Sequence, residues 1–344
     1  MYRFVENIVT FTCAGPAGKS DLWTGHTTPP TSAWKVIRQS ASCFRRQCPG
    51  VVQYGQNAPS ATLFYFRGAR FPSPPVSPQG LELVESFEVR DDDVFVSASL
   101  SQDTDVLAIL LCFPPNTYNC TVWPPLPRPT LPGLSSPYGW HRERSLPHSM
   151  KTHLPYNMLP KQAREGKGKI VYCARNPKDV VVSEHNMGLI NDYLQPLSWE
   201  ESLHEFLSAL PANLWWNVIS EYWRHKDDAN LLFIKYEDMK KDLRGHVVKI
   251  AEFLGRSLTD EQTDEVTANC TFAAMKENLA TNYSRDPVLK EKEFKRGNET
   301  GIEFIRKGQV GDWRNWFSPQ QLEAFEAFDR EKMAGTDLTF EDED

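Results

Sequence analysis

The feature that most constrains the fold is a strand-to-helix junction near the middle of the chain. Lys169–Ala174 is a short apolar, β-branched run of the kind that forms a buried strand. Asn176 is a good N-cap and Pro177 suits a first helical position, so we expect a helix with Ser183 on its second turn. Arg175 then lies between a strand's carboxyl end and a helix N-terminus. Anions bind at such junctions because unpaired N–H groups and the helix dipole face the ligand.

Other segments alternate between strand and helix patterns. Val94–Val96 and Leu231–Tyr236 are further candidates for buried strands. Helical patterns are expected at residues 81–87, 199–210, 213–224 and 243–254, from Thr259 onward, and after a Ser318-Pro319-Gln320-Gln321 capping box. Strands that alternate with helices predict an α/β fold with a central, mostly parallel sheet flanked by helices.

Charge and cysteine content restrict the partners and the cellular setting. The net charge of −7 does not favour nucleic acid or an acidic membrane surface as a partner, so any basic site must be local. The seven cysteines form no C-x-x-C pair, which fits a reducing, cytoplasmic location. The longest apolar run, Val106–Phe113, is less than half a membrane span. We expect a cytoplasmic protein with no nucleic-acid partner, no membrane partner and no metal.

Two segments differ from the rest of the chain. In residues 1–62 basic residues outnumber acidic ones, and the apolar residues keep neither the spacing of a strand (every 2 residues) nor that of a helix (every 3.6 residues). We therefore expect a divergent, poorly ordered extension over 1–62 and a domain over 63–344. Residues 97–148 contain nine prolines, which exclude long helices and central strands there. We expect this stretch to be an atypical Pro-rich segment of the domain.

The extension contains a sequence similar to a phosphate-binding loop. Gly15–Ser20 resembles the end of G-x-x-x-x-G-K-[ST], but Cys13 stands where the first glycine belongs. The following residues include Pro29-Pro30 and do not predict the helix that the loop requires. A P-loop nucleotide hydrolase that uses Lys19 is therefore kept only as an alternative function, ranked below the two that are described in the following paragraphs.

Four motifs resemble those of the cytosolic sulfotransferases, which transfer a sulfuryl group from 3′-phosphoadenosine-5′-phosphosulfate (PAPS) to a hydroxyl or amine. They are Lys151-Thr-His153-Leu-Pro, Ala174-Arg-Asn-Pro-Lys-Asp-Val-Val-Val-Ser183, Tyr236-Glu-Asp-Met-Lys and Phe304-Ile-Arg-Lys-Gly308-x-x-Gly-Asp-Trp313. The resemblance covers residues 149–344 and 67–96, about two-thirds of the chain. It implies a P-loop-like sulfotransferase fold, PAPS as co-substrate and a small hydroxyl or amine acceptor.

The resemblance also implies which residues bind the nucleotide. Arg175 and Ser183 would hold its 3′-phosphate, which would also be bound by Arg306, Lys307 and Gly308. Three further residues would lie against the nucleoside: Tyr236, Thr271 and Phe272. The chemistry of these residue types agrees. Arginine offers a planar fork for phosphate, serine adds a donor, and glycine lets the backbone approach closely.

The reacting group is implied in the same way. His153 would be the general base, because a neutral imidazole near pH 7 can accept the proton of the attacking hydroxyl. Lys151 would stabilise charge on the transferred group. Outside these motifs a histidine before Leu-Pro is usually a loop residue, and an arginine at a strand end is usually a solvated charge. The tryptophans are expected to pack in the core rather than line an acceptor pocket: Trp215, Trp216, Trp223, Trp313 and Trp316.

The sequence departs from the family after its first core strand. There the family has a phosphosulfate-binding loop of the type Thr-Tyr-Pro-Lys-Ser-Gly-Thr-x-Trp, whereas residues 97–105 contain neither glycine nor lysine. Asp103 and Asp105 would repel a phosphate. We therefore expect poor sulfate transfer or none. The alternatives to an active enzyme are a nucleotide-binding pseudoenzyme and an aberrant splice or gene-model product.

The family's dimer motif, Lys-x-x-x-Thr-Val-x-x-x-Glu, is also altered. Its counterpart here runs from Arg314 through Ser318-Pro319 to Glu323, so the terminal charges persist and the central pair does not. A homodimer through this degraded motif is a possibility that the sequence leaves open.

Overall fold

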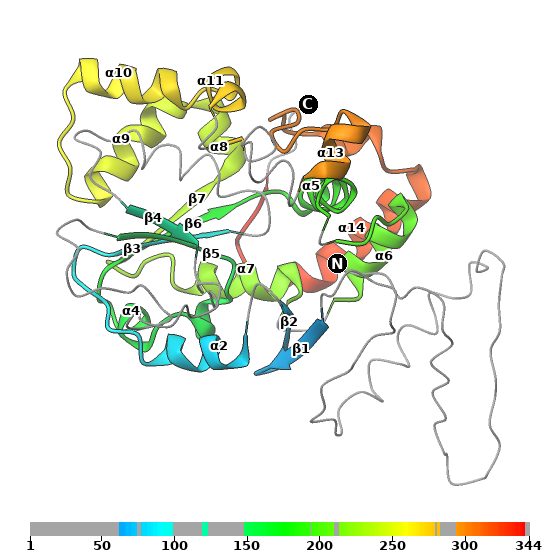
Figure 1. The fold of residues 1–344 in the computed structure, drawn as a ribbon, viewed down its shortest axis with the longest axis horizontal. Coiled ribbons are helices and arrows are strands. Elements are labelled where there is room, and N and C mark those ends of the chain that lie inside the picture. The colour runs from blue at the N-terminus through cyan, green and yellow to red at the C-terminus, as the bar shows by residue number, and fades with distance from the viewer. Residues whose placement is uncertain are drawn as a thin grey trace, which may run out of the picture. The chain divides into compact units, whose positions relative to one another are not determined.

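The computed structural model describes residues 62–73, 77–98, 119–122, 148–192, 194–209, 213–278, 281–282 and 294–340 (Figure 1). From Leu63 onward the described residues belong to one compact unit. The expected extension up to residue 61, with the phosphate-loop-like Gly15–Ser20, lies outside the described residues. So does most of the Pro-rich segment 97–148, and the boundaries of both segments stay predictions.

A five-stranded sheet forms the centre of the domain (Figure 1). Its strands stand in the order β4 (Asn119–Val122), β5 (His148–Thr152), β3 (Val94–Ala98), β6 (Lys169–Ala174) and β7 (Leu231–Lys235). Every neighbouring pair is parallel. A second sheet pairs β1 (Thr62–Phe66) with β2 (Ala69–Ser73). The predicted α/β class with a parallel central sheet is confirmed.

Helices cover both faces of this sheet (Figure 1). The helices of the described residues are α2 (Pro78–Glu85), α4 (Lys161–Arg164), α5 (Pro177–Ile190), α6 (Trp199–Leu207), α7 (Trp215–Arg224), α8 (Tyr236–Lys241), α9 (Leu243–Phe253), α10 (Asp260–Asn269), α11 (Phe272–Glu277), α13 (Lys295–Thr300) and α14 (Pro319–Met333). Two short 3-10 helices are η1 (Tyr156–Met158) and η3 (Asp312–Asn315). Among the described residues, no helix combines the length and the apolar character needed to cross a membrane.

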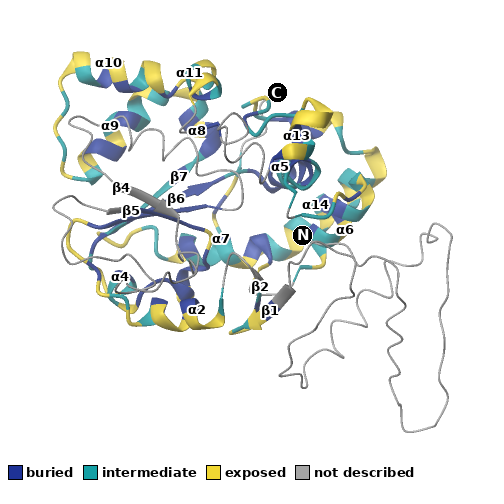
Figure 2. Ribbon diagram, viewed as in Figure 1, coloured by how far each residue is buried: buried dark blue, intermediate teal, exposed yellow. Residues whose placement is uncertain are grey.

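Alternating strand residues build two separate cores. Phe95 and Tyr172 pack into a cluster with α7 and α14, whereas their neighbours Val96 and Val171 pack into a second cluster with α9 and α10. This follows from the period of two along a strand, which sends successive side chains to opposite faces. Figure 2 shows the buried strands β3 and β6 between helices whose outer faces are exposed. Both faces are covered, as parallel sheets require.

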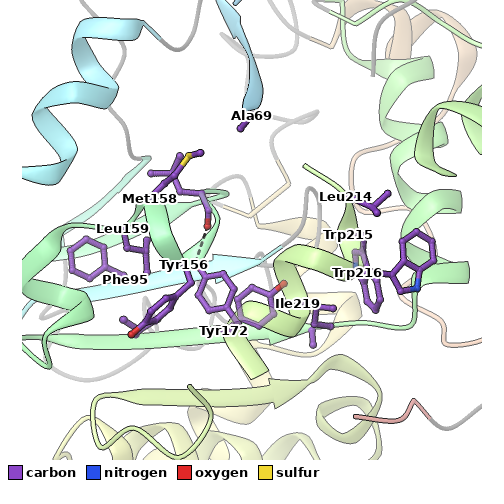
Figure 3. Close-up of a cluster of buried hydrophobic side chains, with 14 of the residues drawn as sticks. Ala69, Phe95, Tyr156, Met158, Leu159, Tyr172, Leu214, Trp215, Trp216 and Ile219 are labelled. Atoms are coloured by element: carbon purple, nitrogen blue, oxygen red, sulfur yellow. Dashed lines mark hydrogen bonds between the residues drawn. The ribbon is translucent and has the colours of Figure 1, made fainter. Parts of the chain in front are cut away.

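The cluster on the α7 face is rich in aromatic side chains (Figure 3). Trp216 is 1% exposed, and its indole N–H donates to Asp329 Oδ1 at 2.6 Å. Trp215 and Trp313 are also buried, in agreement with the packing role expected for them, whereas Trp223 and Trp316 are half-buried. Truncating a buried tryptophan typically costs about 3–5 kcal/mol, so this cluster contributes strongly to the stability of the fold.

The local signals at the central junction are confirmed. The Asn176 side chain accepts from Lys178 N at 3.0 Å, and Pro177 is the first residue of α5. Helix α14 begins with the expected capping box at Ser318. Elsewhere the boundaries differ from prediction. Helix α2 begins at Pro78 rather than 81, because Ser77 caps it by accepting from Gly80 N at 3.0 Å.

Other predicted boundaries were also wrong. Tyr236 begins α8 instead of ending β7, while α6 ends at Leu207 and α7 begins at Trp215. Strand β3 continues beyond Val96, because Ser97 pairs with Tyr172 of β6 and Ala98 pairs with Cys173. Both are buried, so these two small residues, which look like the start of a loop in the sequence, belong to the sheet.

Candidate functional site

A pocket lies where β6 ends and α5 begins, at the carboxyl edge of the sheet. It is lined by most of the residues that the sequence assigned to nucleotide binding: Arg175, Ser183, Tyr236, Phe272, Arg306, Lys307 and Gly308. The other lining residues are Asp179, Val182, Met275, Phe304, Ile305, Gln309 and Asp312. Segments more than a hundred residues apart in sequence therefore converge on one cavity.

Arg175 is fixed in this pocket but keeps one unsatisfied donor. Its Nη2 donates to the Gln309 carbonyl oxygen at 2.9 Å and lies 3.7 Å from Asp179 Oδ2. The guanidinium carbon stands 4.5 Å from the ring centroid of Tyr236. The Nε atom is buried and has no hydrogen-bond partner among the described residues. A buried donor left unpaired is costly unless a ligand or water satisfies it, so the arrangement suits an anionic ligand.

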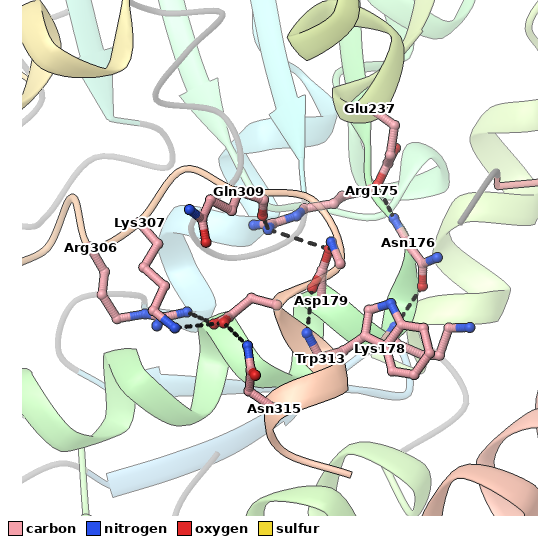
Figure 4. Close-up of polar contacts among 12 residues, drawn as sticks. Arg175, Asn176, Lys178, Asp179, Glu237, Arg306, Lys307, Gln309, Trp313 and Asn315 are labelled. Atoms are coloured by element: carbon pink, nitrogen blue, oxygen red, sulfur yellow. Dashed lines mark hydrogen bonds and ion pairs between the residues drawn. The ribbon is translucent and has the colours of Figure 1, made fainter. Parts of the chain in front are cut away.

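Asp179 fastens the segment that carries the other cations to α5 (Figure 4). Its side chain is 1% exposed. Oδ2 accepts from the backbone N–H of Gly311 at 2.7 Å, and Oδ1 accepts from that of Trp313 at 3.0 Å. One carboxylate thus holds both a distant loop and, through the 3.7 Å ion pair, Arg175.

The cations Arg306 and Lys307 converge on a second buried carboxylate, Asp312 (Figure 4). Lys307 Nζ lies 2.6 Å from Asp312 Oδ1, Arg306 Nη2 contacts Oδ2, and Asn315 Nδ2 donates to Oδ1 at 2.9 Å. Burial alone would raise the pKa of Asp312, but the hydrogen bonds from these three residues outweigh it and hold the pKa well below its ordinary value. The carboxylate stays ionised, and both cations are held at the rim of the pocket.

Gly308 allows the backbone to pass close to an aromatic ring. Its φ of +60° is in the left-handed region, and an added Cβ would stand 2.2 Å from Cδ2 of Phe272. A side chain is therefore excluded both by conformation and by space. Thr271 precedes this ring and caps α11, with Oγ1 accepting from Ala274 N at 3.3 Å. Thr271 does not line the pocket.

The two remaining predicted residues, Lys151 and His153, lie at the end of β5 and do not line the pocket. Lys151 is 7% exposed and pairs in register with Val96 of β3. The His153 ring contacts Ala98, with Nδ1 2.9 Å from its carbonyl oxygen. Because β3 lies between β5 and β6, the end of β3 separates the histidine from Arg175.

The contact with Ala98 decides how the His153 ring carries its hydrogen. A carbonyl oxygen only accepts, so Nδ1 must be the protonated nitrogen. In the neutral ring the lone pair that can accept a proton is then on Nε2. A histidine that acts as a general base uses such a nitrogen. His153 is exposed, whereas Lys151, Thr152, Leu154 and Pro155 are all buried. The fold therefore exposes the His153 ring on a turn whose neighbouring residues are buried.

Sequence reasoning assigned no role to several residues that shape the site. Asp179 and Asp312 stand inside the quoted motifs, and Glu237 follows Tyr236 in another. Glu237 Oε1 accepts from Asn176 N at 2.8 Å, which ties α8 to the start of α5. Burial raises the pKa of this carboxyl group. The sequence signal that could have identified these residues is an acidic side chain within an otherwise basic motif. Such a side chain stands out because a carboxylate is buried only where hydrogen-bond donors surround it.

A parallel α/β sheet with an Arg- and Lys-lined pocket at its carboxyl edge is typical of proteins that bind anions or nucleotides. A model of the sulfotransferase domain family matches residues 95–337, which is more than half of the chain. The chain belongs to this family and is a sulfotransferase-family enzyme by homology.

Individual relatives agree. Amine sulfotransferase from Oryctolagus cuniculus is 34% identical over 287 residues, covering 81% of this chain and 93% of that protein. Sulfotransferase 2B1 from Mus musculus is 35% identical over 281 residues, covering 79% of this chain and 80% of that protein. The structure of mouse sulfotransferase SULT7A1 complexed with PAP aligns with a TM-score of 0.66 and 29% identity, over 80% of this chain and 95% of that chain.

Proposed function

We propose that this chain binds PAPS at the described pocket and transfers its sulfuryl group to a small hydroxyl or amine acceptor, with His153 as general base. One observation carries the proposal. Arg175 lies in the same pocket as Ser183, Arg306 and Lys307, and its buried Nε has no partner among the described residues. Such a cavity suits the 3′-phosphate of the nucleotide, since it offers charged donors in a fixed arrangement.

The chemistry follows from the groups at the strand ends. His153 Nε2 would accept the proton of the acceptor as its oxygen or nitrogen attacks sulfur, and the nucleotide's 5′-phosphate would leave. Lys151, held in β5 beside β3, would stabilise the negative charge on the transferred group. Tyr236 and Phe272 would lie against the nucleoside, and Thr271 would position Phe272 as the cap of α11.

The comparisons support this proposal at the level of the family. The related rabbit protein is named an amine sulfotransferase, which fits an amine or hydroxyl acceptor. The solved mouse relative holds PAP, the nucleotide that remains after the sulfuryl group has left. The same pocket in this chain would bind that product, 3′-phosphoadenosine-5′-phosphate, whether or not transfer occurs.

A second candidate is a nucleotide-binding protein with little or no transfer. It is favoured by the sequence that follows Ala98, which offers no glycine or lysine for the 5′-phosphosulfate where the family has its loop. An aberrant splice or gene-model product would give the same sequence. Sequencing the transcript across residues 90–150 separates that origin from a native pseudoenzyme.

Calorimetric titration with PAP tests the pocket independently of turnover. Wild-type protein should bind PAP, and Arg175→Ala should weaken binding about 100-fold, because charge-assisted hydrogen bonds to a buried phosphate are lost. Arg175→Lys is the matched control: it keeps the charge without the fork, and should bind with intermediate affinity. If Arg175→Ala binds PAP as tightly as the wild type, the proposed site is wrong.

Turnover distinguishes the two candidates. If PAP binds and PAPS is consumed with a phenol or amine acceptor, and His153→Gln abolishes that turnover, the chain is an active sulfotransferase. Tight PAP binding without turnover identifies the pseudoenzyme instead. A cytoplasmic location and a homodimer through the region from Arg314 to Glu323 stay predictions; cell fractionation and light scattering would test them.

A further inference from the structure

A buried tyrosine outside the family motifs connects the base to the centre of the sheet. Tyr222 of α7 is 0% exposed. Its ring stacks on Tyr172 of β6, with centroids 3.9 Å apart and an interplanar angle of 20°. On another side the Tyr156 ring meets it edge-on at 5.5 Å and 85°. Held between two rings in a packed core, the phenol cannot swing to another position.

The hydroxyl of Tyr222 joins two strand ends. It donates to the Leu154 carbonyl oxygen at 2.8 Å and lies 2.8 Å from the Oγ of Ser97. A phenol has only one hydrogen, which the carbonyl takes, so Ser97 must donate to the phenol oxygen. The result is a buried chain of two hydrogen bonds from β3 to the residue after His153.

This chain acts on the same turn that presents the base. Leu154 N donates to Thr152 Oγ1 at 3.2 Å, so the turn is also closed on itself. His153 lies between these two fixed residues, and its Nδ1 reaches the Ala98 carbonyl oxygen at 2.9 Å. Ser97 and Ala98 are adjacent, so Tyr222 and His153 bind neighbouring residues at the end of β3. A shift of the turn relative to β3 would break both contacts.

We propose that Tyr222 is a positioning residue for the base: its hydroxyl holds the His153 turn against β3, so that Nδ1 stays bonded to Ala98 and Nε2 stays basic. This inference rests on the proposed role of His153. The hydroxyl remains protonated, because burial raises the pKa of Tyr222 well above its ordinary value despite the opposing bond from Ser97. It therefore keeps its hydrogen throughout the physiological pH range.

The test is the tautomer of His153, measured by nitrogen-15 NMR on protein with labelled histidines. The His153 signals are assigned by their loss in His153→Gln. Tyr222→Phe removes one hydroxyl and keeps the ring stack, and Ser97→Ala removes the other end of the chain. Tyr172→Phe is the matched control, because it removes a hydroxyl from the neighbouring buried ring and leaves both bonds of Tyr222 in place.

The wild type and Tyr172→Phe should show His153 protonated at Nδ1. In Tyr222→Phe, and more weakly in Ser97→Ala, this tautomer should lose its dominance while the His185 signals stay unchanged. If the wild type already carries its hydrogen on Nε2, the proposed base geometry fails. If the wild type is protonated at Nδ1 and both variants keep that tautomer, only the role of Tyr222 is overturned.

Kinetics give a second readout where turnover is measurable. Tyr222→Phe should lower kcat about tenfold and leave the KM for PAPS unchanged, because the nucleotide pocket does not include Tyr222. A purely structural contribution would instead lower the amount of folded enzyme without separating kcat from KM. Equal kcat in Tyr222→Phe and Tyr172→Phe would contradict the proposal.

Discussion

The ends of β6 and β3 are neighbours in the sheet but are equipped very differently. After β6 come Arg175, a helix cap and a pocket closed by the distant Arg306–Gly308 segment. After β3 the sequence from Ser99 to Pro127 contains no glycine, lysine or arginine. On the proposed function these strand ends are the two ends of one nucleotide site, and the contrast teaches that each end is encoded by its own stretch of sequence. The packed domain keeps Arg175 and its pocket whatever sequence follows β3.

Restoring the second end should produce the largest effect. Replacing residues 99–106 with Tyr-Pro-Lys-Ser-Gly-Thr-Ala-Trp supplies a lysine and a glycine at the end of β3. Because each preorganised donor is typically worth about 100- to 1,000-fold in rate, PAPS turnover should rise at least 100-fold. The measurement is kcat with a phenol acceptor. A graft with lysine changed to alanine is the control, and equal rates in the two grafts would refute this explanation of the contrast.

Damaging the first end should have the next largest effect. Gly308→Ala forces a Cβ to within 2.2 Å of the Phe272 ring and should weaken PAP binding about 100-fold, a loss of about 2.7 kcal/mol. Gly335→Ala is the matched control. Its φ is +89°, but no atom lies within 4 Å of the added Cβ, so it should retain PAP affinity. Equal losses in both variants would mean that backbone strain, not the ring contact, matters.

Weakening the hydrogen bonds that Asp179 accepts from the backbone of Gly311 and Trp313 should have a smaller effect. In Asp179→Asn one backbone N–H, of Gly311 or Trp313, faces an amide that cannot accept. We expect PAP affinity to fall about tenfold and affinity for 5′-AMP, which lacks the 3′-phosphate, to change little. Asp264→Asn, at an exposed ion pair with Arg244, is the control. A parallel loss for both nucleotides would instead indicate general destabilisation.

The smallest effect concerns His185, a residue of α5 that does not line the pocket. His185 Nδ1 lies 2.9 Å from Ser202 Oγ, the ring contacts Trp199 and Trp316, and burial lowers its pKa below the ordinary 6.5. The unfolded chain therefore takes up a proton more readily, and stability should fall as pH drops below 6.5. One proton limits this slope to about 1.4 kcal/mol per pH unit.

Chemical denaturation of wild type and His185→Gln at several pH values measures that contribution. Glutamine does not titrate, so its stability should depend less on pH between 7 and 5. Two charges that act on the histidine are Glu200, which raises the pKa, and Arg306, which lowers it. Identical slopes in the two proteins would exclude His185 as a source of acid sensitivity.

Local sequence predicted the central junction well and missed features that depend on distant partners. Asn176 and Pro177 act on the first turn of their own helix, so their effect is readable in a few residues. Ser97 and Ala98 resemble a loop, and only the register with β6 shows them to be strand residues. Tyr236 looked like the end of an apolar strand because β7 and α8 follow one another without a linker.

The same distinction holds for the site. The motifs identified most of the residues that line the pocket, yet gave no partner for Asp179, whose donors lie about 130 residues away at Gly311 and Trp313. Nor could they show that Tyr222 bonds to the residue beside His153. Such contacts depend on how helices pack on the sheet, and no local pattern encodes them.

The central position of β3 has a consequence for how such a protein can change. Any segment that follows Ala98 must start between His153, which follows β5, and Arg175, which follows β6, whatever its sequence. The strand order fixes the position of this junction, whereas the sequence that follows Ala98 can vary. A new peptide inserted there would lie between His153 and the pocket that contains Arg175, so a change at this one junction would act on both halves of the proposed site.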